Sequence, residues 1–299
     1  MIISGASGKG GTGKTTVAVS LALSVSGEAD IAFFDCDVEE PNAHIFLKPE
    51  MVASHNVEIP VPDINEKTCT HCGDCARICR YNAIIVMKDR VLVFDNLCHG
   101  CGGCTLLCPV EAIRETGKVI GTVQWGRAKG IAFTSGTLAM GEVLSPRVIK
   151  ETKKLIDPNK VNIIDCPPGT SCPVVESVKG SSFCLLVTEP TPFGLNDLKI
   201  SHEVLRELNI PSGVVINKAS DRYDAKIEAF CESAGIDVLM KIPWDVSIAR
   251  GYSEGIPLID TAREWKERFA GLFKKVKRGI SKTEPQMPAA HKRLVRIDC

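Results

Sequence analysis

The sequence GKGGTGKTT, residues 8–16, decides the fold of this chain. Apolar residues 2–4 precede it and apolar-rich residues 15–25 follow it, which predicts a strand, a glycine-rich loop and a helix. The spacing GxxxxGKT fits residues 8–15, and such a loop cradles phosphate groups with its backbone amides. We therefore expect a bound nucleotide triphosphate, with Lys14 reaching its β- and γ-phosphates and the Thr15 hydroxyl binding Mg²⁺. The nucleotide-binding residues expected here are Gly8, Lys9, Gly10, Gly11, Thr12, Gly13, Lys14, Thr15 and Thr16.

The composition indicates a soluble globular protein with a sizeable core. Of the 299 residues 44% are hydrophobic, and 36 basic residues balance 36 acidic ones. This balance lacks the basic footprint of a nucleic-acid binder, so we expect no nucleic-acid partner. The sequence begins with no signal peptide and contains no run of 18 apolar residues, so we expect a cytoplasmic protein.

Apolar stretches alternate with helical patterns over most of the chain. A strand is expected at residues 31–37, and several strands and helices alternate beyond residue 118. This alternation predicts an α/β fold with a mostly parallel sheet flanked by helices. Pro60 and Pro62 indicate an extended connector before a cysteine-rich segment. We therefore expect a phosphate-loop domain in two segments, 1–60 and 119–280, an inserted domain at 61–118, and a poorly ordered or weakly docked tail at 281–299.

The inserted segment contains one pattern of cysteines twice. The spacing C-x2-C-x2-C-x3-C begins at Cys69 and recurs 29 residues later at Cys98. It is the spacing of bacterial ferredoxins with two [4Fe-4S] clusters, in which each run supplies three ligands to one cluster and the fourth to the other. The expected ligands are Cys69, Cys72, Cys75 and Cys108 for one cluster and Cys98, Cys101, Cys104 and Cys79 for the second.

Other uses of these thiols fit the pattern less well. Zinc sites take two well-separated pairs of ligands, whereas closely spaced triples suit three corners of a cubane cluster. Disulfides are rare in cytosolic proteins. One irregularity is Arg80, which stands where Pro109 follows the fourth cysteine of the second run. A cation there would favour the reduced cluster, although a tolerated surface substitution explains it equally well.

The early lysine of the loop, in KGGTGKTT, carries a family resemblance. It resembles the deviant phosphate loop of the MinD, ParA, Mrp and nitrogenase iron protein group of ATPases. The resemblance implies a P-loop sheet of the SIMIBI class, bound ATP with Mg²⁺, and an ATP-dependent homodimer in which Lys9 touches the phosphates of the partner subunit. With its cysteine insertion, the chain is similar to the members of this superfamily that accompany orange-protein metallocluster systems.

The resemblance also implies roles for individual residues. Lys9, Lys14 and Asp37 are expected to be catalytic, and Asp37 would orient the attacking water. Asp35 and Asp165 are expected near Mg²⁺, together with Thr15. The pieces expected to bind adenine are Asn217, Pro243 and Asp245. Residues 37–49 and 165–172 correspond to two segments that respond to the nucleotide.

Features outside these motifs have two interpretations each. Cys36, Cys184 and Cys231 lie in apolar contexts and are expected to be buried. For Cys172 we favour structural packing over a redox or metal-contact role, because the upstream cysteine that a shared interface cluster needs is missing. An apolar stripe near the C-terminus fits core packing or, less readily, membrane binding. The stripe consists of Trp265, Phe269, Leu272, Phe273 and Val276.

These observations predict an ATP-hydrolysing iron-sulfur protein. In the favoured hypothesis, nucleotide state gates electron transfer through two [4Fe-4S] clusters to a redox or metallocluster partner. One alternative is an ATPase that assembles or carries metalloclusters. Another is a MinD-like positioning ATPase whose clusters sense redox state.

Overall fold

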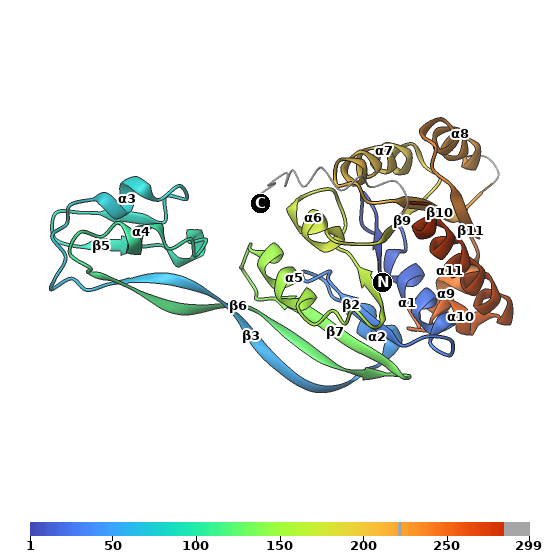
Figure 1. The fold of residues 1–299 in the computed structure, drawn as a ribbon, viewed down its shortest axis with the longest axis horizontal. Helices are drawn as coiled ribbons and strands as arrows, with labels where there is room; N and C mark the ends of the chain where they lie inside the picture. The colour runs from blue at the N-terminus through green and yellow to red at the C-terminus, as the bar shows by residue number, and fades with distance from the viewer. Residues whose placement is uncertain (221–222, 284–299) are drawn as a thin grey trace. The chain divides into compact units, whose positions relative to one another are not determined.

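The computed structural model describes residues 1–220 and 223–283; of the tail expected at 281–299, everything after residue 283 lies outside the described residues. The chain divides into two compact units (Figure 1). The first unit consists of residues 1–54, 123–137 and the described residues from 145 on, and the second of residues 55–122 and 138–144. The second unit contains all eight cysteines of the repeated pattern and is called the cysteine-rich unit below.

The first unit is built on a mostly parallel sheet, as the alternating pattern predicts. The strand order is β11-β10-β9-β1-β8-β2-β7-β6-β3, and the pairs from β11 to β7 are parallel. The strands are β1 (Ile2–Ala6), β2 (Ile31–Asp35), β3 (Glu50–Ile64), β6 (Ile113–Ala128), β7 (Ile131–Leu138), β8 (Val161–Asp165), β9 (Phe183–Thr188), β10 (Ser212–Ala219) and β11 (Val238–Pro243). Strands β3 and β6 each contribute residues to both units.

Helices cover both faces of this sheet (Figure 1). The helices of the first unit are α1 (Lys14–Val25), α2 (Ala43–Leu47), α5 (Ser145–Lys153), α6 (Cys172–Val178), α7 (Pro192–Glu207), α8 (Asp224–Ala234), α9 (Val246–Ser253), α10 (Leu258–Thr261) and α11 (Arg263–Thr283). On one face, α1, α2, α10 and α11 share a core with Phe33, Ile163 and Leu185. The next residue of each strand, Phe34, Ile164 and Leu186, is equally buried. Side chains on both faces are therefore apolar, as is usual for parallel strands.

The apolar stripe of α11 is part of this core. Trp265, Phe269, Leu272, Phe273 and Val276 are at most 4% exposed. Helix α11 contacts α1, and the stripe packs within the core on that face of the sheet. A side chain committed to the core cannot also enter a lipid surface, so the membrane interpretation of this stripe is wrong. Among the described residues, no helix is long and apolar enough to cross a membrane.

The cysteine-rich unit is small and repeats itself. Apart from its parts of β3 and β6, its elements are α3 (Asp74–Ile78), β4 (Ile84–Val86), β5 (Val91–Val93), the 3₁₀ turn η1 (Asp95–Leu97) and α4 (Gly103–Leu106). Strands β4 and β5 form an antiparallel pair. Helix α4 starts 29 residues after α3, so the sequence repeat is also a structural repeat.

The segment with Pro60 and Pro62 is a strand rather than an irregular connector. Both prolines lie in β3, which is the last strand of the sheet order. Proline has no N–H to donate to a ladder, and an edge strand has one side on which none is needed. The sequence therefore predicted an extended backbone correctly but not its pairing.

Replacing Phe269 with alanine tests the assignment of the stripe to the core. Phe269 is fully buried, so its loss should lower the free energy of unfolding by about 3–5 kcal/mol. The exposed Lys274 of the same helix provides the control, because Lys274→Ala should change that free energy by no more than about 0.5 kcal/mol. Urea unfolding followed by circular dichroism measures both. Equal stability of the two variants would contradict the packing described here.

Candidate functional site

The glycine-rich loop ends at the first residue of α1. Gly11 and Gly13 have φ values of 76° and 93°, which turn the backbone in a way that other residues adopt only at a cost. No side chain caps the N-terminus of α1, so its first N–H groups are available to an anion. Lys14 and Thr15 follow directly and are 6% and 8% exposed. The loop thus has the features of a phosphate cradle.

The end of β10 holds this loop in place. The Asn217 side-chain amide donates to the Thr12 carbonyl at 2.7 Å, and Lys218 Nζ donates to the Gly11 carbonyl at 2.9 Å. A Cβ atom on Gly13 would overlap Asn217 Nδ2. The contact seen for Asn217 is therefore with the loop, and its expected contact with adenine stays a prediction.

Three carboxylates lie where β2 and β8 end. Asp35 of β2 and Asp165 of β8 are register partners, and both are fully buried. Both oxygens of Asp35 accept backbone hydrogen bonds, from Asp37 at 3.2 Å and from Ala43 at 3.0 Å. Asp35 thereby anchors the segment that begins at Asp37. Asp35, which is expected near Mg²⁺, thus also has a structural role.

Burial and mutual repulsion raise the pKa values of these three carboxyl groups. Burial, the neighbouring Asp165 and then Asp37 raise the pKa of Asp35 well above its usual range. Burial also raises the pKa of Asp37 to about 6 and that of Asp165 to about 6, although the nearby positive charge of Lys14 opposes both shifts. A cation placed among these groups would favour their charged forms.

The Asp165 carboxylate fits a magnesium site. It is buried, and neither of its oxygens has a hydrogen-bond partner of normal geometry among the described residues. Buried polar atoms of this kind call for a ligand. Carboxylate and hydroxyl oxygens are the ligands that Mg²⁺ prefers in nucleotide sites. The Thr15 side chain lies near Asp165 and acts to lower the pKa of its carboxyl group. The residues present therefore suit a nucleotide with Mg²⁺.

The other sequence-predicted residues of this site have separate local roles. Lys9 forms an ion pair with Glu189 of its own chain. Pro243 is the register partner of Ala219, which places it beside the end of β10. Asp245 caps α9 by accepting from the Ser247 N–H at 2.6 Å. Glu189, the partner of Lys9, lies outside the motifs that predicted this site.

Changing Gly13 to alanine should disable the loop. The added Cβ atom would push against Asn217 while holding φ at a value that alanine disfavours. Strain of this size predicts a dissociation constant for MgATP raised about tenfold or more. Gly27→Ala is the matched control, because a Cβ there meets nothing within 4 Å. Fluorescence titration with a labelled nucleotide measures the effect, and unchanged affinity would contradict this role of Gly13.

The eight cysteines of the repeat line two separate hollows. Cys69, Cys72, Cys75 and Cys108 line the first, and Cys79, Cys98, Cys101 and Cys104 line the second. These are the two groups of four that the spacing predicts. All thirteen cysteines among the described residues are free thiols. Each hollow therefore offers four thiol sulfurs to one occupant.

Backbone N–H groups point at four of these sulfurs in a repeated arrangement. His71 N–H donates to Cys69 Sγ and, 29 residues later, Gly100 N–H donates to Cys98 Sγ, each at 3.4 Å. Ala83 donates to Cys79 at 3.3 Å and Ala112 to Cys108 at 3.2 Å. Such donors stabilise sulfur that carries negative charge, as it does when it binds a metal.

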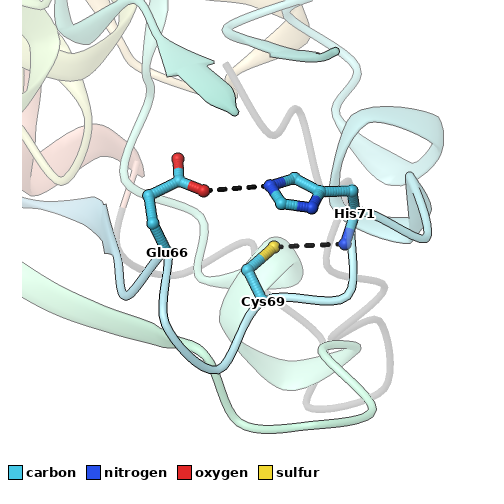
Figure 2. A group of neighbouring side chains, drawn as sticks. All are labelled: Glu66, Cys69 and His71. Atoms are coloured by element: carbon cyan, nitrogen blue, oxygen red, sulfur yellow. Dashed lines mark hydrogen bonds and ion pairs between the residues drawn. The ribbon is translucent and has the colours of Figure 1, made fainter. Parts of the chain in front are cut away.

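One side of the first hollow carries an extra contact (Figure 2). Glu66 Oε2 lies 3.0 Å from His71 Nε2, and Glu66 Oε1 accepts from the Val91 N–H at 2.9 Å. His71 has a φ of 55°, where its repeat counterpart is Gly100. The Glu66 bridge therefore holds a strained turn that aims an N–H at Cys69. The donor atoms of Glu66, Cys69 and His71 lie within 4.8 Å of one another.

The remaining cysteines differ from one another in exposure. Cys36, Cys184 and Cys231 are buried, as expected, and so is Cys166, which sequence analysis did not single out. Burial raises the pKa of the Cys184 thiol to about 12 and that of Cys231 to about 11, so these thiols are unreactive. Cys172 is exposed at the start of α6, so the packing role favoured for it is wrong.

Comparison with known proteins places the chain in a family. The CobQ/CobB/MinD/ParA nucleotide binding domain matches residues 3–258. The chain belongs to this family. It thus has a nucleotide-binding domain of the group to which MinD and ParA belong, as the resemblance implied. The ferredoxin interpretation of the cysteine-rich unit stays a prediction.

The chain is also similar to individual proteins. An uncharacterized protein of Methanocaldococcus jannaschii is 32% identical over 85% of this chain and 90% of its own length. A protein of the same organism named iron-sulfur cluster carrier protein is 25% identical over 90% of this chain and 81% of its own length. Among solved structures, septum site-determining protein MinD of Pyrococcus horikoshii, complexed with Mg-ADP, has a TM-score of 0.59 at 22% identity. That match covers 93% of this chain and 96% of the MinD chain.

Proposed function

We propose that this ATPase holds two [4Fe-4S] clusters in its cysteine-rich unit and that its nucleotide state controls electron transfer through them to a partner protein. The ATP-bound form would be a homodimer. The observation that carries the proposal is the grouping of eight thiols into two hollows of four, each with backbone N–H groups directed at its sulfurs. Clusters of this kind supply one-electron transfer.

The surroundings of the thiols suit such clusters better than zinc. Ile64, Val86, Val91 and Ile113 line the first hollow together with its cysteines. Two of these cysteines, Cys75 and Cys108, come from different runs, so a cluster would tie the two repeats together. A zinc ion needs only four sulfurs in a tetrahedron and leaves the closely spaced triple unexplained.

The residues of the phosphate site have complementary tasks in hydrolysis. The amides of the loop and of the first turn of α1 bind phosphate oxygens, and Lys14 offsets their charge. Thr15 and Asp165 would hold Mg²⁺. Asp37 is anionic at neutral pH, because its pKa of about 6 lies below 7, and it can accept a hydrogen bond from the attacking water. Asp35 holds the segment that carries Asp37.

The chain itself connects the phosphate site to the cysteine-rich unit. The segment anchored by Asp35 runs through residues 37–49 and continues into β3, whose later residues belong to the cysteine-rich unit. Strand β7 pairs with β2 at Ser135 and Asp35, and residues 138–144, which begin with the last residue of β7, also belong to that unit. A nucleotide that moves residues 37–49 therefore acts on the strand that leads to the thiols.

A metallocluster carrier is the second candidate. It is supported by the relatives named iron-sulfur cluster carrier protein, which are 24–25% identical to this chain. Loss of iron from this chain to a metal-free acceptor, driven by MgATP, would favour the carrier. Electron transfer without loss of iron would favour our proposal. The positioning alternative is weakened by the burial of the α11 stripe.

Iron analysis tests the cluster assignment. Chain purified without oxygen should contain about eight iron atoms, four in each cluster. Cys72→Ser and Cys101→Ser should each reduce the iron content by about four and leave the other cluster visible by electron paramagnetic resonance after reduction. The control is Cys172→Ser, which changes a thiol outside the cysteine-rich unit and should retain about eight. Iron-poor wild-type chain after anaerobic reconstitution would refute the assignment.

Lys14→Ala tests the coupling. Without the Lys14 charge, the loop should bind MgATP poorly while the cysteine-rich unit keeps its iron. MgATP should then no longer accelerate electron transfer from the reduced chain to an acceptor, measured by stopped-flow absorbance. The control is Lys226→Ala, on the exposed side of α8, which should retain the acceleration. If wild-type chain transfers electrons at the same rate with and without MgATP, nucleotide state does not control transfer.

A further inference from the structure

One carboxylate next to the phosphate loop binds two lysines and is assigned to no step of hydrolysis. Glu189, directly after β9, forms an ion pair with Lys9 through Oε1, and its Oε2 lies 3.2 Å from Lys218 Nζ. Its side chain is 13% exposed, against 36% for Lys9 and 46% for Lys218. A mostly buried anion is thus shared by two cations at the rim of the loop.

A rigid turn fixes the backbone of Glu189. The Glu189 carbonyl accepts from the Thr191 N–H at 2.8 Å. Thr191 Oγ1 accepts from the Gly194 N–H at 2.9 Å, and Thr188 Oγ1 donates to the Gly194 carbonyl at 2.9 Å. A Cβ atom on Gly194 would overlap the Glu189 carbonyl oxygen. The turn therefore fixes the backbone position from which the Glu189 side chain reaches the two lysines.

The two lysines are held to different degrees. Lys218 has a second acceptor, the Gly11 carbonyl at 2.9 Å. For Lys9 the side-chain contact seen is with Glu189, while its backbone carbonyl accepts from the Ser7 hydroxyl at 2.7 Å. The Lys9 ammonium can therefore leave without disturbing the loop backbone, and Lys218 would still neutralise Glu189.

We propose that Glu189 is a positioning residue that holds the Lys9 ammonium in the nucleotide-free chain, and that Lys9 exchanges this carboxylate for a phosphate oxygen of bound MgATP. No covalent bond or proton moves in this exchange. Lys9 cannot contact both anions fully, so the energy of the Glu189 contact is subtracted from that of nucleotide binding. The proposal deepens the proposed nucleotide function and is independent of the clusters.

The charge balance of Glu189 supports this exchange. Burial acts to raise the pKa of Glu189, but hydrogen bonds and positive charge from Lys9 and Lys218 together hold it below the usual range. The carboxylate is therefore charged at neutral pH and competes with phosphate. The competition should weaken with added salt, because both partners are partly exposed.

A double-mutant cycle on the full chain tests the exchange. Glu189→Gln keeps the size of the side chain and removes its charge, so with Lys9 present the dissociation constant for a nonhydrolysable MgATP analogue should fall about three- to tenfold. In a Lys9→Ala background the same change should have no effect. Glu189→Asp, which keeps the charge, should stay closer to wild type than Glu189→Gln. Calorimetric titration at one fixed chain concentration measures the four affinities of the cycle and that of Glu189→Asp.

The controls separate this proposal from simpler explanations. Glu207→Gln removes an exposed charge from α7 and should leave the affinity unchanged. If Glu189→Gln tightens binding equally with Lys9→Ala, the carboxylate repels phosphate directly and the exchange is refuted. Weaker binding by Glu189→Gln would assign Glu189 a structural role and refute it too. Wild-type chain that binds no nucleotide would contradict the proposed function instead.

Discussion

The phosphate site depends on the register of β2 against β8. This register places Asp35 directly opposite Asp165, with both carboxylates fully buried. Two such groups repel each other at low dielectric, and their pKa values rise accordingly. This repulsion is offset because backbone N–H groups donate hydrogen bonds to Asp35 and the positive charge of Lys14 lies near Asp165. A slip of one residue in this register would point the Asp35 and Asp165 side chains to opposite faces of the sheet.

The cysteine-rich unit faces a different constraint, because its apolar core is small. Its hydrophobic cluster centres on Cys75, Ile84, Val91 and Ile113, and further cysteines pack against it. A core of this size stabilises little structure by itself, and small domains commonly add metal ligation or cross-links. If the proposed clusters are bound, thiols that are also part of the core would couple folding of this unit to cluster binding. Because each cysteine run would supply the fourth ligand of the other run's cluster, the clusters would then link the two repeats.

Local patterns predicted much of this molecule, and their failures are instructive. The motif at residues 8–16 was predicted from its glycine and lysine spacing, the parallel sheet from the alternation of apolar strands with helical patterns, and the family from the resemblance that includes Lys9. The division of the eight cysteines into two sets of four was predicted from their spacing alone, because the two repeats fold with similar backbone turns. The roles of Asn217 and Glu189 could not be predicted, since both depend on which loops meet at the end of the sheet. The amphipathic pattern of α11 is the same for a core helix and a membrane helix, so only packing distinguishes them.

Two carboxylates that hold neighbouring groups indicate how a bound nucleotide would affect the rest of the chain. Asp35 holds the start of the segment that leads into β3, and Glu189 holds the side chain of Lys9. Both contacts are made within the chain, and a phosphate with its cation would compete for the charges on which each depends. A switch requires contacts that differ between its two states. In this chain Asp35 and Glu189 make such contacts, whereas the strands that lead to the thiols are continuous backbone. In the proposed function, control by nucleotide therefore begins at these two contacts.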